Sequence, residues 1–403
     1  MSARCGQPDA IRIRGLGLIT PLGEDLETSW RRIVDGAAID DHARAPIAST
    51  PGVDRVTALG ATVAREAIAA AGWSPSRHDG DRTALVVGTS KGPVDDWIET
   101  WQGRLASADQ PDARTRQPAH DVAAPPSTSD KPLDPFSQLR SEIGLHTVAA
   151  GIRREINPGI GPVLTISCAC ATGIAALIRG ILMLRDGSAD RVVVVATESS
   201  LHPLFLGSFR RLGVLTAPGE PVRPLDQRRS GFLISEAAAA MCLERGHPQP
   251  GDILIDRFAM GADATHLTGI DPQGQTIRSC LKQVQTDQPI DLVHAHATGT
   301  QLNDPIELAA IDDLAAATAS RLIVYSHKAA IGHSLGAAGL ISVVLNCMMH
   351  REGIVPGNIN THLPLTSRQA TINRAVVRQP IRRSIAMAAG FGGAAAAISL
   401  VSA

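Results

Sequence analysis

Short runs of apolar, β-branched residues alternate along the chain with longer segments rich in alanine. The runs include RTALVVGTS, GPVLTIS and DRVVVVATES before residue 200, and ILIDRFAMG, DLVHAHATGT and RLIVYSHKAAIG after residue 251. Continuous apolar strands are typical of parallel sheets that are covered on both faces. The intervening segments have the composition of helices. The pattern therefore predicts an α/β protein in which strands and helices alternate.

One stretch, residues 104–133, breaks this alternation. It is rich in Pro, Ser, Asp and Ala, holds few apolar residues and has no sustained period. Such a composition predicts a surface insertion or a mobile loop. The loop is either a solvated excursion without chemistry or, as loops of this kind can be, a cover for an active site.

The same arrangement of strand and helix occurs in both halves of the chain. In the first half a strand leads into Cys168 and Cys170 and then into ATGIAALIRGILML; in the second, LIVYS leads through HKAAIGH into SLGAAGLISVVLNCMM. Each half thus places a nucleophilic or polar side chain where a helix begins, next to unpaired N–H groups and the positive end of the helix dipole. We expect two similar halves, 1–248 with the nucleophile and 249–403 with histidines.

Composition and charge exclude several classes of protein. With 44% hydrophobic and 19% charged residues the chain is globular, and a net charge of −1 gives no electrostatic case for nucleic acid or an anionic membrane. Aromatic residues, at 3%, are too few for base-stacking platforms. No apolar run reaches the roughly 18 residues of a membrane span, and the N-terminus lacks an apolar signal segment. We expect a cytoplasmic protein whose six cysteines are thiols rather than a disulfide scaffold.

Four segments carry side chains that suit one common mechanism. Taken singly, each has an ordinary structural explanation, because a cysteine before a helix is usually a small buried residue and a histidine on a strand usually belongs to the core. Their combination is what indicates chemistry. The segments are SCACATG (Cys168, Cys170), HAHATGTQLND (His294, His296, Thr298, Thr300), SHKAAIGHSLGAAG (His327, Lys328, His333) and AAGFGGAAAA (Phe391, Gly392).

In their order and spacing these segments resemble the β-ketoacyl-acyl carrier protein synthases, the condensing enzymes of fatty acid and polyketide synthesis. The resemblance runs from GLGLITPLG to GFGGAAAAISLV and includes RPLDQRRSGFLISEAAA and DATHLT. It implies a thiolase-like fold of two duplicated halves in a layered αβαβα architecture. It also implies a homodimer or a ketosynthase heterodimer, and a reaction that needs neither metal nor cofactor.

The resemblance selects the reactive thiol. In the family the nucleophilic cysteine lies three residues before a glycine, so Gly173 selects Cys170. The helix N-terminus and nearby imidazoles are expected to favour its thiolate relative to the ordinary pKa of about 8.5. Strand alternation predicts that Cys168 shares a face with Cys170. Cys168 is then a packed neighbour or a partner in oxidation or metal binding, although no nearby cluster completes a metal site.

The resemblance also assigns the other roles. An acyl group is expected to move from an acyl carrier protein thioester to Cys170, after which a malonyl thioester loses carbon dioxide. His296 and His333 match the imidazoles that hold the enolate through Nε2, and the N–H groups of Cys170 and Phe391 match the oxyanion donors. Lys328 is expected beneath the histidines, where it tunes their field. Substrate-binding positions, for which turn chemistry is the alternative at the threonines, are Thr298, Thr300, Thr268 and Gly392.

Several positions depart from the family's pattern. Many relatives carry a Glu nine residues after the second histidine, where this chain has Ser342, so Lys328 lacks that partner. An unpaired Lys328 would disfavour protonation of the imidazoles. Small residues stand at four further positions of the motifs, namely Ala297, Ala389, Ala394 and Ala395. Other polar residues of the motifs match no role; His294 and His327 are expected to be structural, and Asp304 and Glu307 to be helix-starting acids.

Two rival functions remain. Thiolases share the fold but use a second cysteine in the C-terminal half, whereas here no cysteine follows Cys347. Non-catalytic partners in ketosynthase heterodimers typically lose the nucleophile, which this chain retains together with both histidines. Arg210 and Arg211 are candidates for a positive rim that binds an acidic carrier protein, or else belong to a solvated helix face.

Overall fold

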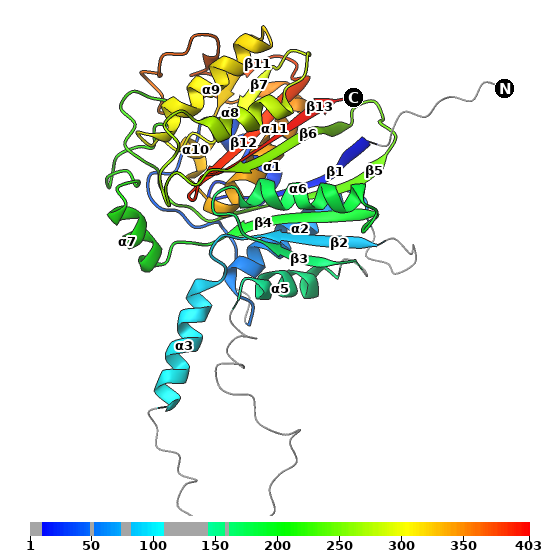
Figure 1. The fold of residues 1–403 in the computed structure, drawn as a ribbon. Helices are drawn as coiled ribbons and strands as arrows, with labels where there is room; N and C mark the ends of the chain where they lie inside the picture. Colours follow the sequence, from blue (N-terminus) through cyan, green and yellow to red (C-terminus); the bar gives the residue numbers. More distant parts are fainter. Residues whose placement is uncertain (1–9, 49–51, 74–81, 109–143, 158–160) are drawn as a thin grey trace, which may run out of the picture.

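One mixed sheet of eleven strands runs through both halves of the chain in the computed structural model, which describes residues 10–48, 52–73, 82–108, 144–157 and 161–403 (Figure 1). In the first half the strand order is β3-β2-β4-β5-β1. Strands β3, β2 and β4 are parallel, whereas β5 and β1 are antiparallel to their neighbours. These strands are β1 (Ala10–Ile19), β2 (Thr83–Gly88), β3 (Val163–Ile166), β4 (Arg191–Glu198) and β5 (Ala237–Gly246).

The second half repeats this topology strand for strand. Its order is β8-β7-β12-β13-β6, again with three parallel strands followed by two antiparallel ones. Strand β10 (Thr371–Ile372) pairs with β8 at the outer edge of this half, and β1 pairs with β6 where the two halves meet. The strands are β6 (Ile253–Ala262), β7 (Leu292–His294), β8 (Ile323–Tyr325), β12 (Arg383–Gly390) and β13 (Ala394–Ser402).

Helices form three layers around the two halves of the sheet (Figure 1). Helices α2 (Arg55–Ala70) and α5 (His146–Ile156) cover the strands of the first half, and α8 (Gln275–Val284) and α9 (Asn303–Ala317) cover those of the second. Between them lie α6 (Thr172–Arg185) and α11 (Ala338–Glu352), each in contact with strands of both halves. The predicted thiolase-like αβαβα architecture with duplicated halves is confirmed.

The central helices are buried around most of their circumference, and are largely apolar, because strands lie on both sides of them. They also approach each other closely. A Cβ atom at Gly173 would lie 2.5 Å from the backbone nitrogen of Leu340, and one at Gly339 would lie 3.0 Å from Ile174. Small residues at this crossing therefore set the spacing between α6 and α11.

The remaining elements lie at the edges of the layers. Residues 104–108, predicted to begin the insertion, instead extend α3, and the rest of that predicted loop, 109–133, lies outside the described residues. The proposed division at 248/249 falls between β5 and β6 and stays a prediction. None of the described helices has the length and apolar character required to cross a membrane. The other elements are α1 (Leu26–Val34), α3 (Val94–Ala108), α7 (Pro203–Arg211), α10 (Lys328–Ile331), a 3-10 turn (Leu335–Ala337), β9 (Ile354–Val355) and β11 (Val377–Arg378).

Candidate active site

The two central helices begin at the same end of the molecule, and each is preceded by one candidate residue. Cys170 lies two residues before α6, and His333 lies just before the 3-10 turn that leads into α11. The close crossing at Gly173 and Leu340 brings these two starts together. Residues 163 positions apart in the chain thus reach one site.

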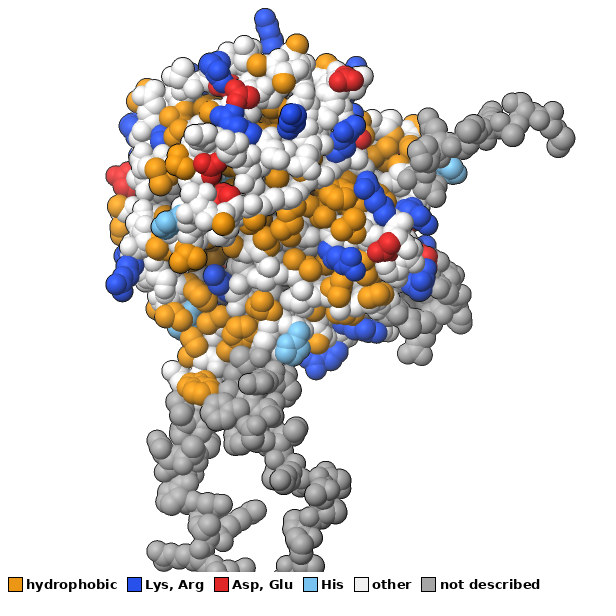
Figure 2. Space-filling view, in the orientation of Figure 1, with side chains coloured by type: hydrophobic (Ala, Val, Ile, Leu, Met, Phe, Trp, Pro, Cys, Tyr) orange, Lys and Arg blue, Asp and Glu red, His pale blue; other side chains and the backbone are white. Residues whose placement is uncertain are grey.

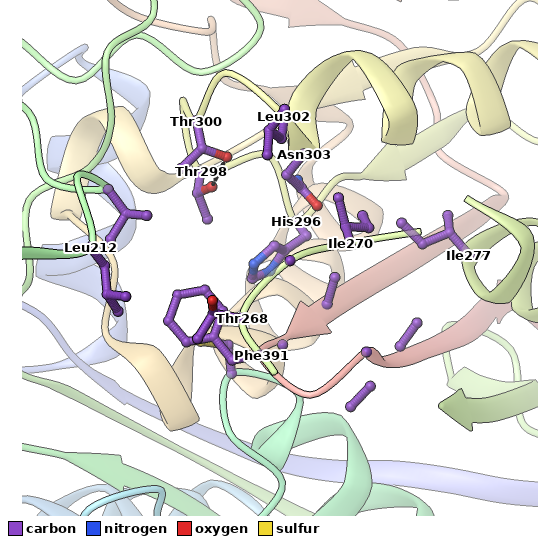
Figure 3. Close-up of a pocket in the computed structure, with 18 of the residues that line it drawn as sticks. Leu212, Thr268, Ile270, Ile277, His296, Thr298, Thr300, Leu302, Asn303 and Phe391 are labelled. Carbon is purple, nitrogen blue, oxygen red and sulfur yellow. Dashed lines mark hydrogen bonds between the residues drawn. The ribbon is translucent and has the colours of Figure 1, made fainter. Parts of the chain in front are cut away.

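A cavity of about 350 Å³ opens at this point and is lined by Cys170, His296, His333 and Phe391. Figure 3 shows His296 between Phe391 on one side and Ile270 on the other, with Thr298 and Thr300 above it. Thr268 also lines the cavity. At the mouth the lining includes Leu212 and Leu302, whose side chains are 47% and 68% exposed. The sequence-predicted nucleophile and imidazoles therefore share one cavity with access to solvent.

The turn at Cys170 differs from the expected strand alternation. Ala169 adopts a left-handed conformation with φ of 43°, a region that non-glycine residues rarely occupy. Thr172 fixes the turn, since its Oγ1 accepts a 2.7 Å hydrogen bond from the N–H of Cys168 and donates to the carbonyl of Ala169 at 2.6 Å.

The left-handed residue sends the two sulfurs into different surroundings. Cys168 packs against the main core between the central helices, whereas Cys170 packs with the cluster that contains Phe209 and Phe232. The expectation that they share a face was wrong, because a single φ above zero ends the alternation of a strand. Both are free thiols, and no group of three or more metal-binding side chains occurs in the described part of the chain.

The hairpin turn between β12 and β13 lies against the backbone of Cys170. A Cβ atom at Gly390 would be 3.1 Å from the nitrogen of Cys170, so a larger residue would push the turn away from Cys170 by a few tenths of an ångström. Phe391 follows and packs its ring 6.0 Å from that of Phe209. Gly392, predicted to bind substrate, is not among the residues that line the cavity. Its φ is 84°, and its N–H donates to the carbonyl of Leu267 at 2.9 Å, so it shapes the turn.

His296 is held by a carboxylate on α9. The two oxygens of Glu307 accept the N–H groups of His296 at 2.5 Å and Ala297 at 2.7 Å. Asp304, one turn earlier, accepts those of Thr298 and Gly299 at 3.1 Å. Both carboxylates are fully buried. The expectation that these residues merely start the helix was wrong, since their hydrogen bonds fix the loop that carries the site.

The two cavity imidazoles meet edge to face, with ring centroids 5.4 Å apart and planes at 80°. The ring of Phe232 packs 4.9 Å from that of His333. Burial lowers the pKa of both imidazoles well below the usual 6.5, and the charge of Lys328 lowers it further. The predicted influence of Lys328 on the imidazoles is therefore present, although burial is the larger cause, and both rings are neutral at physiological pH.

The electrostatics of Cys170 contradict the expected thiolate. Burial raises the pKa of its thiol to about 12, and the positive charges of Lys328 and Lys91 oppose this without reversing it. The expectation assumed that charged imidazolium rings would stabilise the thiolate, but both rings are neutral. A proton therefore sits on Sγ in the free protein.

Lys328 is buried behind the cavity. Burial lowers the pKa of its ammonium to about 8, while Glu307 is the strongest opposing influence. Burial in turn raises the pKa of Glu307, but three N–H donors, two from the backbone and one from Asn303, favour its ionised form. The hydroxyl of Ser342 donates to the carbonyl of Ala338 at 3.2 Å. The negative charge opposite Lys328 is thus that of Glu307 on α9. The sequence did not predict this partner.

One sequence signal could have identified these carboxylates. Asp304 and Glu307 stand three residues apart in a segment, NDPIELAAIDDLAAA, that is otherwise largely apolar. Acids three residues apart face the same side of a helix. A pair on the buried face needs partners, because a carboxylate without hydrogen bonds is costly to bury.

A thiol and one imidazole precede the two central helices of this duplicated five-layer α/β fold, and a second imidazole follows strand β7. This is the arrangement of thiolase-like condensing enzymes. Family models for the N-terminal and C-terminal domains of beta-ketoacyl synthase match residues 47–248 and 255–362. This chain belongs to the beta-ketoacyl synthase family.

Curated relatives of the chain come from both fatty acid and polyketide synthesis. It is 25% identical to 3-oxoacyl-[acyl-carrier-protein] synthase 2 of Coxiella burnetii, over 87% of this chain and 88% of that one. It is 27% identical to the mitochondrial 3-oxoacyl-[acyl-carrier-protein] synthase of Arabidopsis thaliana, over 97% and 92%. It is 28% identical to the tetracenomycin polyketide synthase ketoacyl synthase alpha subunit of Streptomyces glaucescens, over 84% and 79%.

Solved structures share the fold at low sequence identity. A beta-ketoacyl synthase from Burkholderia phymatum aligns with a TM-score of 0.79 at 19% identity, covering 98% of this chain and 100% of that one. A type II polyketide synthase ketosynthase, solved with its acyl-carrier protein, aligns with a TM-score of 0.78 at 22% identity and the same coverage. These likenesses establish the fold.

Proposed function

We propose that this chain is a catalytically active condensing enzyme, a β-ketoacyl synthase that uses Cys170 as its nucleophile. The observation that carries the proposal is the meeting of Cys170, His296 and His333 in one accessible cavity. A chain that served solely as a binding subunit would have no need to keep this set. The carboxylate and ammonium of Glu307 and Lys328 behind the cavity support the same conclusion.

In the first stage the thiol of Cys170 attacks the carbonyl of an acyl thioester carried by an acyl carrier protein. The new bond joins Sγ to the acyl carbon, and the carrier's sulfur departs with the thiol proton. Because burial keeps that proton on Sγ, it must leave as the bond forms, with a neutral imidazole of the cavity as its acceptor. The backbone next to Gly390 lies against Cys170, where the N–H groups of Cys170 and Phe391 can hold the oxyanion.

In the second stage a malonyl thioester loses its carboxylate as carbon dioxide and leaves an enolate. His296 and His333, both neutral, are suited to donate hydrogen bonds to the enolate oxygen. The enolate carbon then attacks the acyl carbon on Cys170, the sulfur departs as thiolate, and one proton from solvent restores the thiol. Thr298 and Thr300, which hydrogen-bond each other at 3.2 Å at the cavity wall, are proposed to bind the pantetheine arm together with Thr268.

The partner in both stages is an acyl carrier protein. The relatives are named for such substrates, and one solved neighbour is a ketosynthase in complex with its carrier. Arg210 and Arg211 are exposed at the end of α7, directly before Leu212 at the cavity mouth. Their position suits an acidic carrier whose arm enters the cavity.

An alternative is that the chain is one subunit of a ketosynthase heterodimer. One solved neighbour, with a TM-score of 0.77, is a ketosynthase/chain length factor. The retained cysteine and histidines favour the catalytic role within such an assembly over that of a binding partner. A homodimer serves the same chemistry.

The test is incubation with an acyl-loaded carrier protein followed by intact mass measurement. We expect one acyl adduct on the wild-type chain and none on Cys170→Ala, with condensed product on addition of a malonyl-loaded carrier. The same measurements on Cys168→Ala should give the adduct unchanged. Absence of any adduct over carrier-bound chains of increasing length would favour the binding subunit.

A further inference from the structure

Two buried histidines behind the cavity form one hydrogen-bonded chain with an asparagine. Nε2 of His294 lies 2.9 Å from Nδ1 of His327, and Nδ1 of His294 lies 2.9 Å from Oδ1 of Asn346. All three residues are fully buried, and none of them is among the residues that line the cavity. Sequence reasoning left both histidines structural, but the chain fixes where each proton sits.

The orientation of the Asn346 amide can be read from its other contacts. Its nitrogen lies 3.4 Å from the carbonyl oxygen of Ile385 and 3.1 Å from the hydroxyl of Ser384. A carbonyl oxygen can only accept, so the amide nitrogen is on that side and Oδ1 faces His294. Because Oδ1 also can only accept, Nδ1 of His294 carries a proton.

The next step fixes the tautomer of His327. Burial lowers the pKa of His294 to about 3, so the ring is neutral and its single proton is on Nδ1. Its Nε2 is therefore an acceptor, and Nδ1 of His327 must donate to it. Burial also holds the pKa of His327 well below its usual value. Nε2 of His327 then presents a lone pair that is buried and has no hydrogen-bond partner among the described residues.

Lys328 is the cation that lies near this lone pair. The groups near enough to shift the pKa of His327 are Lys328, His294, His333 and His296, and the three histidines are neutral. Lys328 carries three donors and no acceptor. The groups that shift the pKa of Lys328 itself are Glu307, Cys170 and Asp304.

We propose that His327 is a positioning residue whose Nε2 accepts a hydrogen bond from one water molecule that the ammonium of Lys328 holds, since no described residue bonds that nitrogen directly. His294 and Asn346 make this possible by fixing the tautomer. The proposal rests on the proposed function, in which Lys328 tunes the two cavity imidazoles. A neutral acceptor orients the ammonium without cancelling its charge, so the charge continues to disfavour protonation of His296 and His333.

The chain positions groups rather than conducting protons. The amide of Asn346 does not ionise or bind a proton at neutral pH, and its Oδ1 carries none, so it cannot relay a proton toward His294. What the amide does is allow one tautomer and exclude the other. Loss of Asn346 should therefore have the same effect as loss of the His327 acceptor.

The first test uses the wild-type protein and needs no enzymatic activity. Long-range nitrogen–proton NMR of histidine-labelled protein reports which ring nitrogen is protonated, with His294→Gln and His327→Gln used for assignment. We expect His294 and His327 both to be protonated on Nδ1 and bare on Nε2 at neutral pH. A proton on Nε2 of His327 would overturn the proposal.

The second test follows malonyl decarboxylation against pH. The positive charge of Lys328 also stabilises the negative charge of the enolate that forms at the two imidazoles, so the rate should fall when the ammonium loses its proton at alkaline pH. The acceptor stabilises the charged lysine and so raises the pKa of Lys328, which means that His327→Leu should move this alkaline fall to lower pH by about one unit. Asn346→Leu should move it in the same direction, and His327→Gln, which restores an acceptor, should return it toward the wild-type position.

The outcomes separate the two proposals. Wild-type protein that forms no acyl adduct on Cys170 contradicts the proposed function, whereas the tautomers still test the role of His327. Wild-type protein that is acylated, with an alkaline fall at the same pH in His327→Leu, contradicts the inference alone. If His327→Leu does not fold, the tautomers and the Asn346→Leu profile decide.

Discussion

Gly173 on α6 and Leu340 on α11 lie so close that a Cβ atom on the glycine would be 2.5 Å from the backbone nitrogen of the leucine. The atom in the way is backbone, which cannot rotate aside. Because Cys170 and His333 precede these two helices, this contact sets the separation of the nucleophile from one imidazole.

Gly173→Ala should therefore lower both stability and condensing activity. Forcing a methyl group against the backbone of α11 is expected to reduce the free energy of unfolding by about 1–3 kcal/mol. It should reduce turnover by more than the loss of folded protein explains. Gly207→Ala is the matched control, because a Cβ there meets nothing within 4 Å. Denaturant unfolding and a condensation assay measure both effects, and wild-type behaviour of Gly173→Ala would contradict the role of the crossing.

Glu307 is the second residue whose loss should reach the site from outside the cavity. Glu307→Gln removes the charge opposite Lys328 and leaves one acceptor oxygen for two backbone N–H groups, those of His296 and Ala297. One buried donor then loses its partner, at a cost of about 1–3 kcal/mol in the free energy of unfolding. We expect condensation to slow by about tenfold, the factor that corresponds to a loss of about 1.4 kcal/mol of transition-state stabilisation, because the loop that carries His296 loses a hydrogen bond.

The control for Glu307 lies on the same helix. Asp313 is half-exposed and pairs on the surface with Arg368, at 2.7 Å, and with Arg278. Asp313→Asn should change the free energy of unfolding by less than about 1 kcal/mol, since exposed ion pairs contribute little. Equal effects of the two variants on turnover would mean that Glu307 has no special relation to the site.

Much of this arrangement could be predicted from sequence because it depends on local patterns. Buried parallel strands appear in the sequence as apolar runs. The motifs follow these runs, so Cys170 and His296 could be placed in the turns after two strands, and His333 before the helix that follows a third. Strand β5 shows the limit. It contains the run 237–240 of four alanines, which favour helix, yet it forms a buried strand in contact with α2, α6 and α11. Its small side chains suit helices on both faces, which is a tertiary requirement.

The electrostatics of the site were harder to predict. A thiol at a helix start was expected to ionise readily, but its pKa depends on how much water surrounds it, and burial is a property of the whole fold. The charge of Glu307 and the tautomer of His327 also depend on the whole fold. The backbone groups bonded to Glu307 and the histidine bonded to His327 lie 10 or more positions away in the sequence. The residue types can be read from the sequence, but the contacts that determine their charge cannot.

The raised pKa of Cys170 makes a direct prediction about reactivity. Alkylation by iodoacetamide requires the thiolate, so its rate should rise about tenfold for each pH unit from pH 7 to 9 without levelling near 8.5, where an ordinary thiol does. The sign follows from the shift: a pKa raised to about 12 leaves the thiol protonated throughout this range. Intact mass against time measures the rate, with Cys170→Ala to assign the site. A rate that levels off below pH 8 would show a stabilised thiolate instead.

Arg210 and Arg211 lie where a carrier protein must dock if its arm is to reach Cys170. Both are exposed at the end of α7, and the next residue, Leu212, lines the cavity mouth. If they bind an acidic surface, changing both to Ala should raise KM for the carrier-bound substrate several-fold and reduce the effect of salt on it. Turnover of a small thioester without carrier should be unchanged, because neither arginine lines the cavity.

Arg153 and Arg154 provide the matched pair for this prediction. They are also adjacent, exposed and near the end of a helix, but they belong to α5 on the outer layer of the first half. Changing them to Ala removes the same net charge, so it controls for long-range attraction between the whole protein and an acidic carrier. A local docking site predicts a larger KM effect at 210 and 211 than at 153 and 154. Equal effects would mean that overall charge, rather than the rim beside the cavity, attracts the carrier.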